Sequence, residues 1–238
     1  MPMTCLNLAV AESLDEMSEM LAKRLENGDD RNTAVLEVVR EVYRAARPIV
    51  FNGNNYAEAW VEEAEKRGLP HDRTAAESLS TLLDEDTSTL FSEYGVAQPH
   101  ELEARYNVRL EQYNTMLEIE AIQMLRMAKT GVLPAAWSQQ AVWAEALQKA
   151  ESLGAAMPAQ RDEFLRYCST VEDCQNGIDA VRAALKGPSA DVTEHAAHVV
   201  KHLLPAMDKL RTACDALERR TDEDLWPFAS YHQMLFQY

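Results

Sequence analysis

The chain has 238 residues, 47% of them hydrophobic, and is long enough to bury a substantial core as one large or two small domains. Its 39 acidic residues outnumber 23 Lys and Arg, and the formal charge of −16 repels phosphate backbones and anionic lipids, so neither nucleic acid nor membrane is expected as a partner. No apolar run approaches the roughly 18 residues of a membrane span, and no leader composition is present, which predicts a cytoplasmic location.

Helix-forming residues dominate, and only 8 Gly and 9 Pro interrupt them, which predicts an all-α fold. A first helix is predicted over residues 6–25, and Asn32 or Thr33 is expected to cap a second. Both carry apolar positions at helical spacing. These are Leu6, Val10, Leu14, Met17, Leu21 and Leu25 in the first, and Val35, Leu36, Val39, Val42 and Tyr43 in the second.

Residues 47–70 combine a proline, a polar turn and a short helix. Pro48 is expected to end the second helix and to move Arg47 out of the helical region, leaving residues 49–51 extended and buried. The turn at residues 52–54 is predicted to adopt left-handed geometry, with Asn54 or Asn55 capping a helix that carries Trp60 and ends at Gly68.

Further along, Thr74 and Glu77 have the spacing of a capping box, and a turn is predicted over residues 87–94. Pro99 opens the longest predicted helix, and Gly131 with Pro134 should kink or break it before a helix that runs to Gly154. The long helix carries a seam for a partner helix. Its members are Tyr106, Leu110, Tyr113, Leu117, Ala121, Met124 and Ala128. We place a domain boundary between residues 97 and 98.

A long antiparallel helical hairpin is predicted over residues 158–220, because two apolar seams face each other across a short loop. The first seam is Phe164, Tyr167, Val171, Cys174, Ile178, Val181 and Leu185, and the second is Val199, Leu203, Ala206, Leu210, Ala213 and Leu217. Pro205 predicts a kink in the second arm. The tail, residues 225–238, is aromatic and nearly uncharged and is expected to dock on another surface, with Trp226, Pro227 and Phe228 as the candidate contact.

Candidate chemical groups are few. His195, His198 and His202 share a helical face and suit a zinc or nickel site, but solvated or capping histidines are the favoured reading. Residues 52–55 fit an anion nest less well than a structural turn. Four acidic residues match a water-facing helix side better than a cation site. They are Glu58, Glu62, Glu63 and Glu65.

Two further predictions concern buried groups. Glu120 lies near the apolar seam, so it is expected to pair with Arg105, Arg109 or Arg126, with a link to an active site as the alternative. The four cysteines form no CxxC pair and are predicted to be reduced, mostly buried thiols. They are Cys5, Cys168, Cys174 and Cys214.

Four segments resemble, in order, the C-terminal region of type III glutamine synthetases. The most specific is RPIVFNGNNYAEAWVEEAEKRGLP at residues 47–70, and another is PMTCLNLAVAE at residues 2–12. The third, within residues 119–135, carries IEA, Met124, MAK and LPA, and the last, within residues 224–236, carries DLWPF, SY and LF. The resemblance spans nearly all of the chain and is weakest over residues 136–190.

The resemblance implies an enzyme that ligates ammonia to glutamate with ATP and Mg²⁺ or Mn²⁺, through a catalytic barrel that precedes this region. No residue of that barrel can be matched here, so no catalytic, cofactor-binding or metal residue is assigned, and the chain alone is expected to be inactive. Its implied role is structural, in contacts with the barrel and with neighbouring subunits of a homo-oligomer. The alternatives are a free-standing helical adaptor or regulator and, from the three histidines, a small metal-binding bundle.

Overall fold

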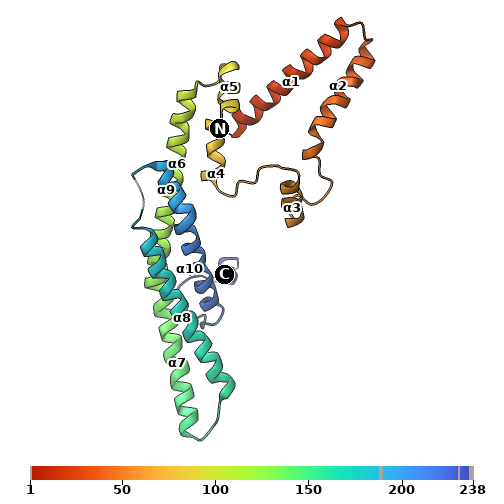
Figure 1. The fold of residues 1–238 in the computed structure, drawn as a ribbon. Coiled ribbons are helices and arrows are strands. Elements are labelled where there is room, and N and C mark those ends of the chain that lie inside the picture. The colour runs from red at the N-terminus through yellow and green to blue at the C-terminus, as the bar shows by residue number, and fades with distance from the viewer. Residues whose placement is uncertain (1, 188–189, 230, 236–238) are drawn as a thin grey trace. The chain divides into compact units, whose positions relative to one another are not determined.

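The computed structural model describes residues 2–187, 190–229 and 231–235, except the side chains of residues 231 and 232 (Figure 1). The described residues form helices and connecting segments without any strand, which confirms the predicted all-α fold. They divide into two compact units, Met1–Tyr106 and Asn107–Tyr238, and the division falls inside one long helix, α6 (Pro99–Met127). The boundary expected at residues 97 and 98 stays a prediction.

The first unit is a chain of helices in which the two longest, α1 and α2, pack against each other and α1 also contacts α5. Gly68 and Gly95 follow α3 and α5 with positive φ values of 72° and 63°, because glycine adopts this left-handed geometry without strain. The elements are α1 (Pro2–Glu26), α2 (Arg31–Ala46), η1 (Arg47–Ile49), α3 (Glu58–Lys66), α4 (Ala75–Leu79), η2 (Ser80–Leu83) and α5 (Glu85–Glu93).

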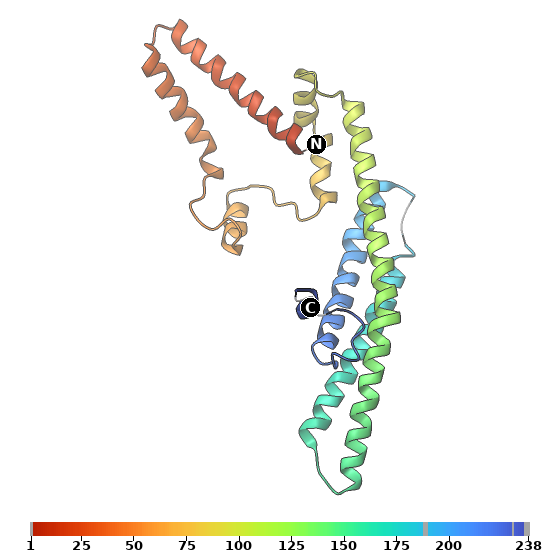
Figure 2. The same cartoon turned by 180° about the vertical axis from the view of Figure 1, so that it is seen from behind.

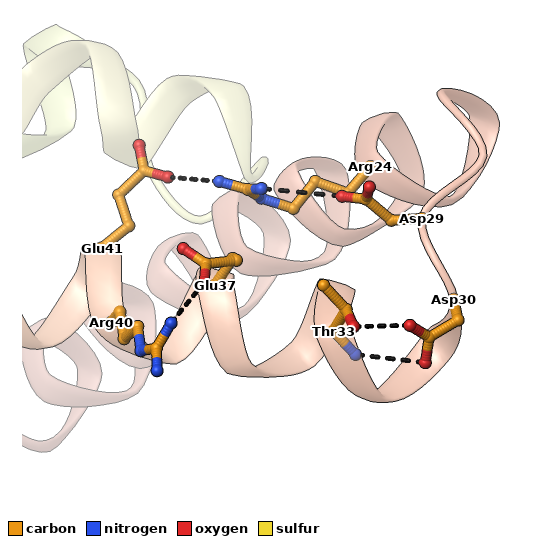
Figure 3. Close-up of polar contacts among 7 residues, drawn as sticks. All are labelled: Arg24, Asp29, Asp30, Thr33, Glu37, Arg40 and Glu41. Atoms are coloured by element: carbon orange, nitrogen blue, oxygen red, sulfur yellow. Dashed lines mark hydrogen bonds and ion pairs between the residues drawn. The ribbon is translucent and has the colours of Figure 1, made fainter.

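Polar contacts fix the turn between α1 and α2 (Figure 3). Asp30, and not Asn32 or Thr33, caps α2, because its Oδ1 accepts hydrogen bonds from the backbone N–H groups of those two residues at 3.0 and 3.3 Å. Arg24 of α1 lies 3.4 Å from Glu41 of α2 and 3.7 Å from Asp29. The guanidinium therefore joins the last turn of α1 both to the loop and to the facing helix.

The apolar stripes of α1 and α2 are largely exposed. Leu8 of α1 is buried, with Phe91, Ala97 and Leu102, in the small core of the first unit. Eight of the eleven side chains on the predicted stripes are instead between 41% and 64% exposed, and Met17, Leu21 and Val42 are half-buried. These exposed residues, which we call the α1–α2 stripes, are Leu6, Val10, Leu14 and Leu25 on α1 and Val35, Leu36, Val39 and Tyr43 on α2.

The second unit is a helical bundle. The segments α6–η3–α7, α8 and α9–η4–α10 pack around one apolar core, and α8 lies beside α10 in both views (Figures 1 and 2). Their bounds are η3 (Ala128–Val132), α7 (Leu133–Ser152), α8 (Pro158–Ala184), α9 (Val192–His198), η4 (Val199–Leu203) and α10 (Leu204–Glu218), and a short α11 (Tyr231–Leu235) follows. None of the described helices is long and apolar enough to cross a membrane.

The predicted hairpin is present. Contacts pair Tyr167 with Thr221, Cys174 with Cys214 and Gly177 with Leu210. The residue numbers rise along α8 while those of the contacted residues fall, so the two arms are antiparallel. All six residues predicted for the second seam are buried. The period of seven therefore identified the core face of both arms, because each arm covers the other.

Two prolines coincide with changes in helix geometry. Pro134 and Pro205 each stand two residues after a π-helical turn, η3 and η4, and the α-helix continues beyond it. A proline within an α-helix lacks the N–H donor and clashes with the carbonyl four residues earlier. The wider turn accommodates the ring, so the irregularities predicted at these prolines take the form of π turns within continuous helical segments.

Candidate functional site

The turn at residues 47–57 differs locally from its prediction. Arg47 is helical, with φ −54° and ψ −36°, because it begins the 3-10 turn η1, in which Pro48 is the second residue. Ile49 is 65% exposed, so the apolar tripeptide is not buried. No residue of this described turn is left-handed. Gly53 lies against the Phe51 ring, which occupies the space that a Cβ would take.

The helix after the turn begins later than expected. Asn54 Oδ1 accepts a hydrogen bond from the backbone N–H of Tyr56 at 3.0 Å, which makes a local turn, and Ala57 is the N-cap residue of α3 without a side-chain cap. Asn54 and Asn55 are therefore not its caps. The short side chain of asparagine favours this local bond over a bond to the helix.

Arg67, at the end of α3, organises the turn. Its Nη1 donates to the carbonyl oxygens of Pro48 at 3.1 Å and Val50 at 2.9 Å. Its Nε donates to Glu63 at 2.8 Å, and the guanidinium lies 5.6 Å from the centroid of the Trp60 ring. The rings of Trp60 and Phe51 are in turn 4.5 Å apart, so one arginine ties the extended segment to α3.

A basic hollow of about 680 Å³ lies against this turn. Arg44 and Arg47 of the α2 end line it together with Arg67, and Asn52 contributes an amide. No acidic residue lines it, although the chain carries a formal charge of −16. Residues 52–55 include no basic residue, and the three arginines come from the helical segments on either side of the turn.

A second hollow, of about 570 Å³, is a groove between α6 and α10. Its walls carry methionines and exposed carboxylates, and Trp226 and Phe228 of the tail close one side. We call it the α6–α10 groove. It is lined by Ile119, Glu120, Gln123, Met124, Met127, Ala128, Val132, Arg211, Cys214, Asp215, Glu218, Trp226 and Phe228.

The aromatic tail docks on its own chain. The Phe228 ring approaches Gly131 of the π turn so closely that a Cβ there would lie 2.8 Å from it, and Trp226 and Phe228 pack against the bundle core. Gln139 Oε1 accepts a hydrogen bond from the N–H of Asp222 at 2.8 Å, and the Tyr167 and Thr221 hydroxyls lie 2.7 Å apart. Within the described part of the tail, these residues therefore serve intramolecular packing; Ser230 and Phe236 lie outside it.

The three histidines make separate contacts. His195 Nε2 lies 3.0 Å from Glu118 Oε1, His198 Nε2 lies 2.8 Å from the carbonyl oxygen of Ala184, and the rings of His198 and His202 are 4.9 Å apart. No set of three or more His, Cys, Asp or Glu side chains suited to a metal ion occurs among the described residues. Two of the imidazoles are accordingly occupied in bonds between helices.

The acidic candidates also sit differently from their expected places. Glu120 is exposed in the α6–α10 groove and forms no ion pair within the described residues, so the predicted burial is wrong. The carboxylate that reaches another helix is Glu118, two positions earlier, because that position turns toward α9. In the run on α3, Glu63 pairs with Arg67 and the other three are exposed, as expected for a water-facing side.

The basic hollow thus belongs to the first unit and the α6–α10 groove to the second. Comparisons with known proteins relate the chain to one family. The glutamine synthetase C-terminal domain family matches residues 34–151. The chain is 29% identical to a type-3 glutamine synthetase of Dictyostelium discoideum, over 99% of the chain and 33% of that protein. It is 26% identical to a glutamine synthetase of Bacteroides fragilis, over 98% of the chain and 33% of that protein.

The chain is similar to the C-terminal portion of glutamine synthetases, which confirms the resemblance seen in the sequence motifs. A glutamine synthetase of Butyrivibrio fibrisolvens agrees, at 25% identity over 88% of the chain and 31% of its own length. The chain thus spans about a third of the length of the curated relatives it matches.

Proposed function

We propose that this chain serves as the C-terminal helical part of a glutamine synthetase and contacts the catalytic part of the same enzyme and neighbouring subunits of a homo-oligomer. The full enzyme would ligate ammonia to glutamate with ATP and Mg²⁺ or Mn²⁺ in the cytoplasm. The described residues present no carboxylate or histidine set for a metal, so no step of that reaction is assigned to this chain.

The observation that carries the proposal is the exposure of the α1–α2 stripes. Isolated apolar side chains are normal on protein surfaces, but two helices with several exposed aliphatic residues at helical spacing indicate a surface for a partner. Val10 and Leu14 are 57% and 59% exposed, and Val39 is 57% exposed. We assign the catalytic part as the occupant because the matched relatives continue for about twice the length of this chain outside the matched region.

The first experiment is the size of the native polypeptide in the source cells, detected with an antibody raised against this chain. A band about three times heavier than 26.8 kDa is expected, since the chain spans 33% of its relatives. A native band at 26.8 kDa would contradict the proposal and favour the free-standing adaptor.

The contact itself is tested in the full enzyme with Leu14→Asp, which places a charge on the exposed stripe. We expect loss of synthetase activity and of the native assembly on size-exclusion chromatography, because an unpaired charge would be buried at the contact. Ser18→Asp adds the same charge at an exposed polar position of α1 and is the matched control. Normal assembly of the Leu14→Asp enzyme would show that this stripe is not the contact.

A further inference from the structure

Two cysteines meet in the core of the second unit. The Sγ atoms of Cys174 on α8 and Cys214 on α10 are 3.8 Å apart, although the residues are 40 positions apart in the chain. Cys174 is fully buried, whereas Cys214 is partly exposed and lines the α6–α10 groove. One thiol is therefore reachable from solvent, and the other lies directly behind it.

The helix backbones are unusually close at this place. A Cβ added to Gly177 would lie only 3.0 Å from Leu210 Cα, so α8 and α10 approach each other where glycine leaves no side chain. Cys174 stands three residues before Gly177, and Cys214 stands four residues after Leu210, each about one helical turn from the contact. A disulfide requires Cα atoms about 4.4–6.8 Å apart, a separation that only closely packed helices offer.

We propose that Cys174 and Cys214 form an oxidisable dithiol that closes to a disulfide between α8 and α10 when hydrogen peroxide enters the α6–α10 groove. In the first step the Cys214 sulfur attacks one peroxide oxygen and the O–O bond breaks. The products are a sulfenic acid on Cys214 and water, which takes the thiol proton. In the second step the Cys174 sulfur attacks the sulfenic sulfur, the S–O bond breaks, and a second water leaves with the Cys174 proton.

The surroundings assign the two roles. A hydrogen bond from the Cys214 thiol lowers the pKa of Cys174, which suits Cys174 to the second attack. The same contact, together with burial, raises the pKa of Cys214. The first step is consequently slow, and the pair responds to sustained oxidant and not to brief exposure.

The other two cysteines lack this arrangement. The Cys168 sulfur accepts a hydrogen bond from Gln140 Nε2 at 3.2 Å, and Cys5 packs at the core of the first unit. Neither is within contact of a second thiol among the described residues. Their replacement by serine provides matched controls, because each substitution removes one thiol from the chain and leaves Cys174 and Cys214 in place.

The test treats the 238-residue chain with hydrogen peroxide, blocks free thiols and measures intact and peptide masses. We expect two fewer blocked thiols than in the untreated chain, and a peptide linked through Cys174 and Cys214 that is about 2 Da lighter than its two reduced peptides. We also expect a rise in melting temperature of about 5 °C, because the cross-link restrains the unfolded chain. Cys5→Ser and Cys168→Ser should behave in the same way, and Cys214→Ser should not cross-link.

Two results would overturn the proposal. One is stepwise oxygen addition to Cys214 without a cross-link, and the other is a disulfide that includes Cys5 or Cys168. Both are read from peptide maps of the unmodified sequence, so the test does not depend on the folding of a core variant. Reversal of the mass change by dithiothreitol separates a disulfide from irreversible oxidation.

Discussion

Replacement of Gly177 by alanine tests the close approach of α8 and α10 most directly. At an ordinary interior position of a helix this change stabilises by about 0.8–1.0 kcal/mol, because alanine has the higher helix propensity. Here the new Cβ would lie 3.0 Å from Leu210 Cα, 3.2 Å from its Cβ and 3.3 Å from its Cδ1. Two of these three atoms are fixed by the α10 backbone and cannot rotate away.

The steric effect should therefore outweigh the propensity. Overpacking of a tight core costs about 1–3 kcal/mol, and this site can relax only by moving α10 as a whole. We expect Gly177→Ala to lower the free energy of unfolding by about 1–2 kcal/mol, and Gly177→Val to lower it further. Because either substitution would push α10 away from α8, it should also reduce cross-linking of Cys174 with Cys214.

Urea unfolding followed by circular dichroism measures the effect, with Asn176→Ala as the control. Asn176 is the exposed neighbour on α8, so its replacement reports helix propensity without the contact and should stabilise by a few tenths of a kcal/mol. A Gly177→Ala protein as stable as the wild type, or more stable, would refute the reasoning. It would show that α10 moves away without cost.

Three further predictions concern polar contacts. Arg67→Lys keeps the charge but loses the paired bonds to Pro48 and Val50, so we expect faster amide exchange over residues 49–52 and about 1 kcal/mol less stability in the first unit. Unchanged exchange would contradict the clamp. Tyr167→Phe removes the hydroxyl contact with Thr221 and should cost about 0.5–1.5 kcal/mol in urea unfolding, with altered Trp226 fluorescence as the tail loosens. Hydrogen bonds from the backbone N–H and side chain of Thr74 hold the pKa of Glu77 below its ordinary 4.5, so its capping contribution is present above that pH and disappears as the pH falls through the lower folded pKa. Protection of the Thr74 amide should accordingly fall on acidification in the wild type and stay low and pH-independent in Glu77→Gln, and equal pH profiles would refute the link.

Sequence periodicity predicted the second unit better than the first for a physical reason. In the hairpin, both apolar faces belong to neighbouring helices of the same chain, and every residue expected on the second seam is buried. On α1 and α2 the same kind of pattern occurs, yet Leu14 and Val39 are exposed. Periodicity reports that a face is apolar, and it does not report which surface covers that face.

The candidate site was less predictable because its contacts join distant residues. Arg67 reaches Pro48 and Val50 across 19 and 17 positions, and no local pattern marks this pairing. Glu120 was expected to pair with an arginine, but Glu118 is the residue that reaches another helix, at His195, since a shift of two positions turns a helical side chain to another side. In contrast, the capping box of Thr74 and Glu77 is local, and it was predicted correctly.

The sequence by itself determined the helical composition, the two arms of the hairpin and the relation to glutamine synthetases, since propensity, short-range spacing and motifs are properties of consecutive residues. Only the tertiary structure decided the register of α8 against α10. That register is set by the contact of Gly177 with Leu210, and it brings Cys174 and Cys214 together. Side-chain packing across two helices selects one register among several that share the same periodicity, so the thiol pair cannot be read from spacing alone.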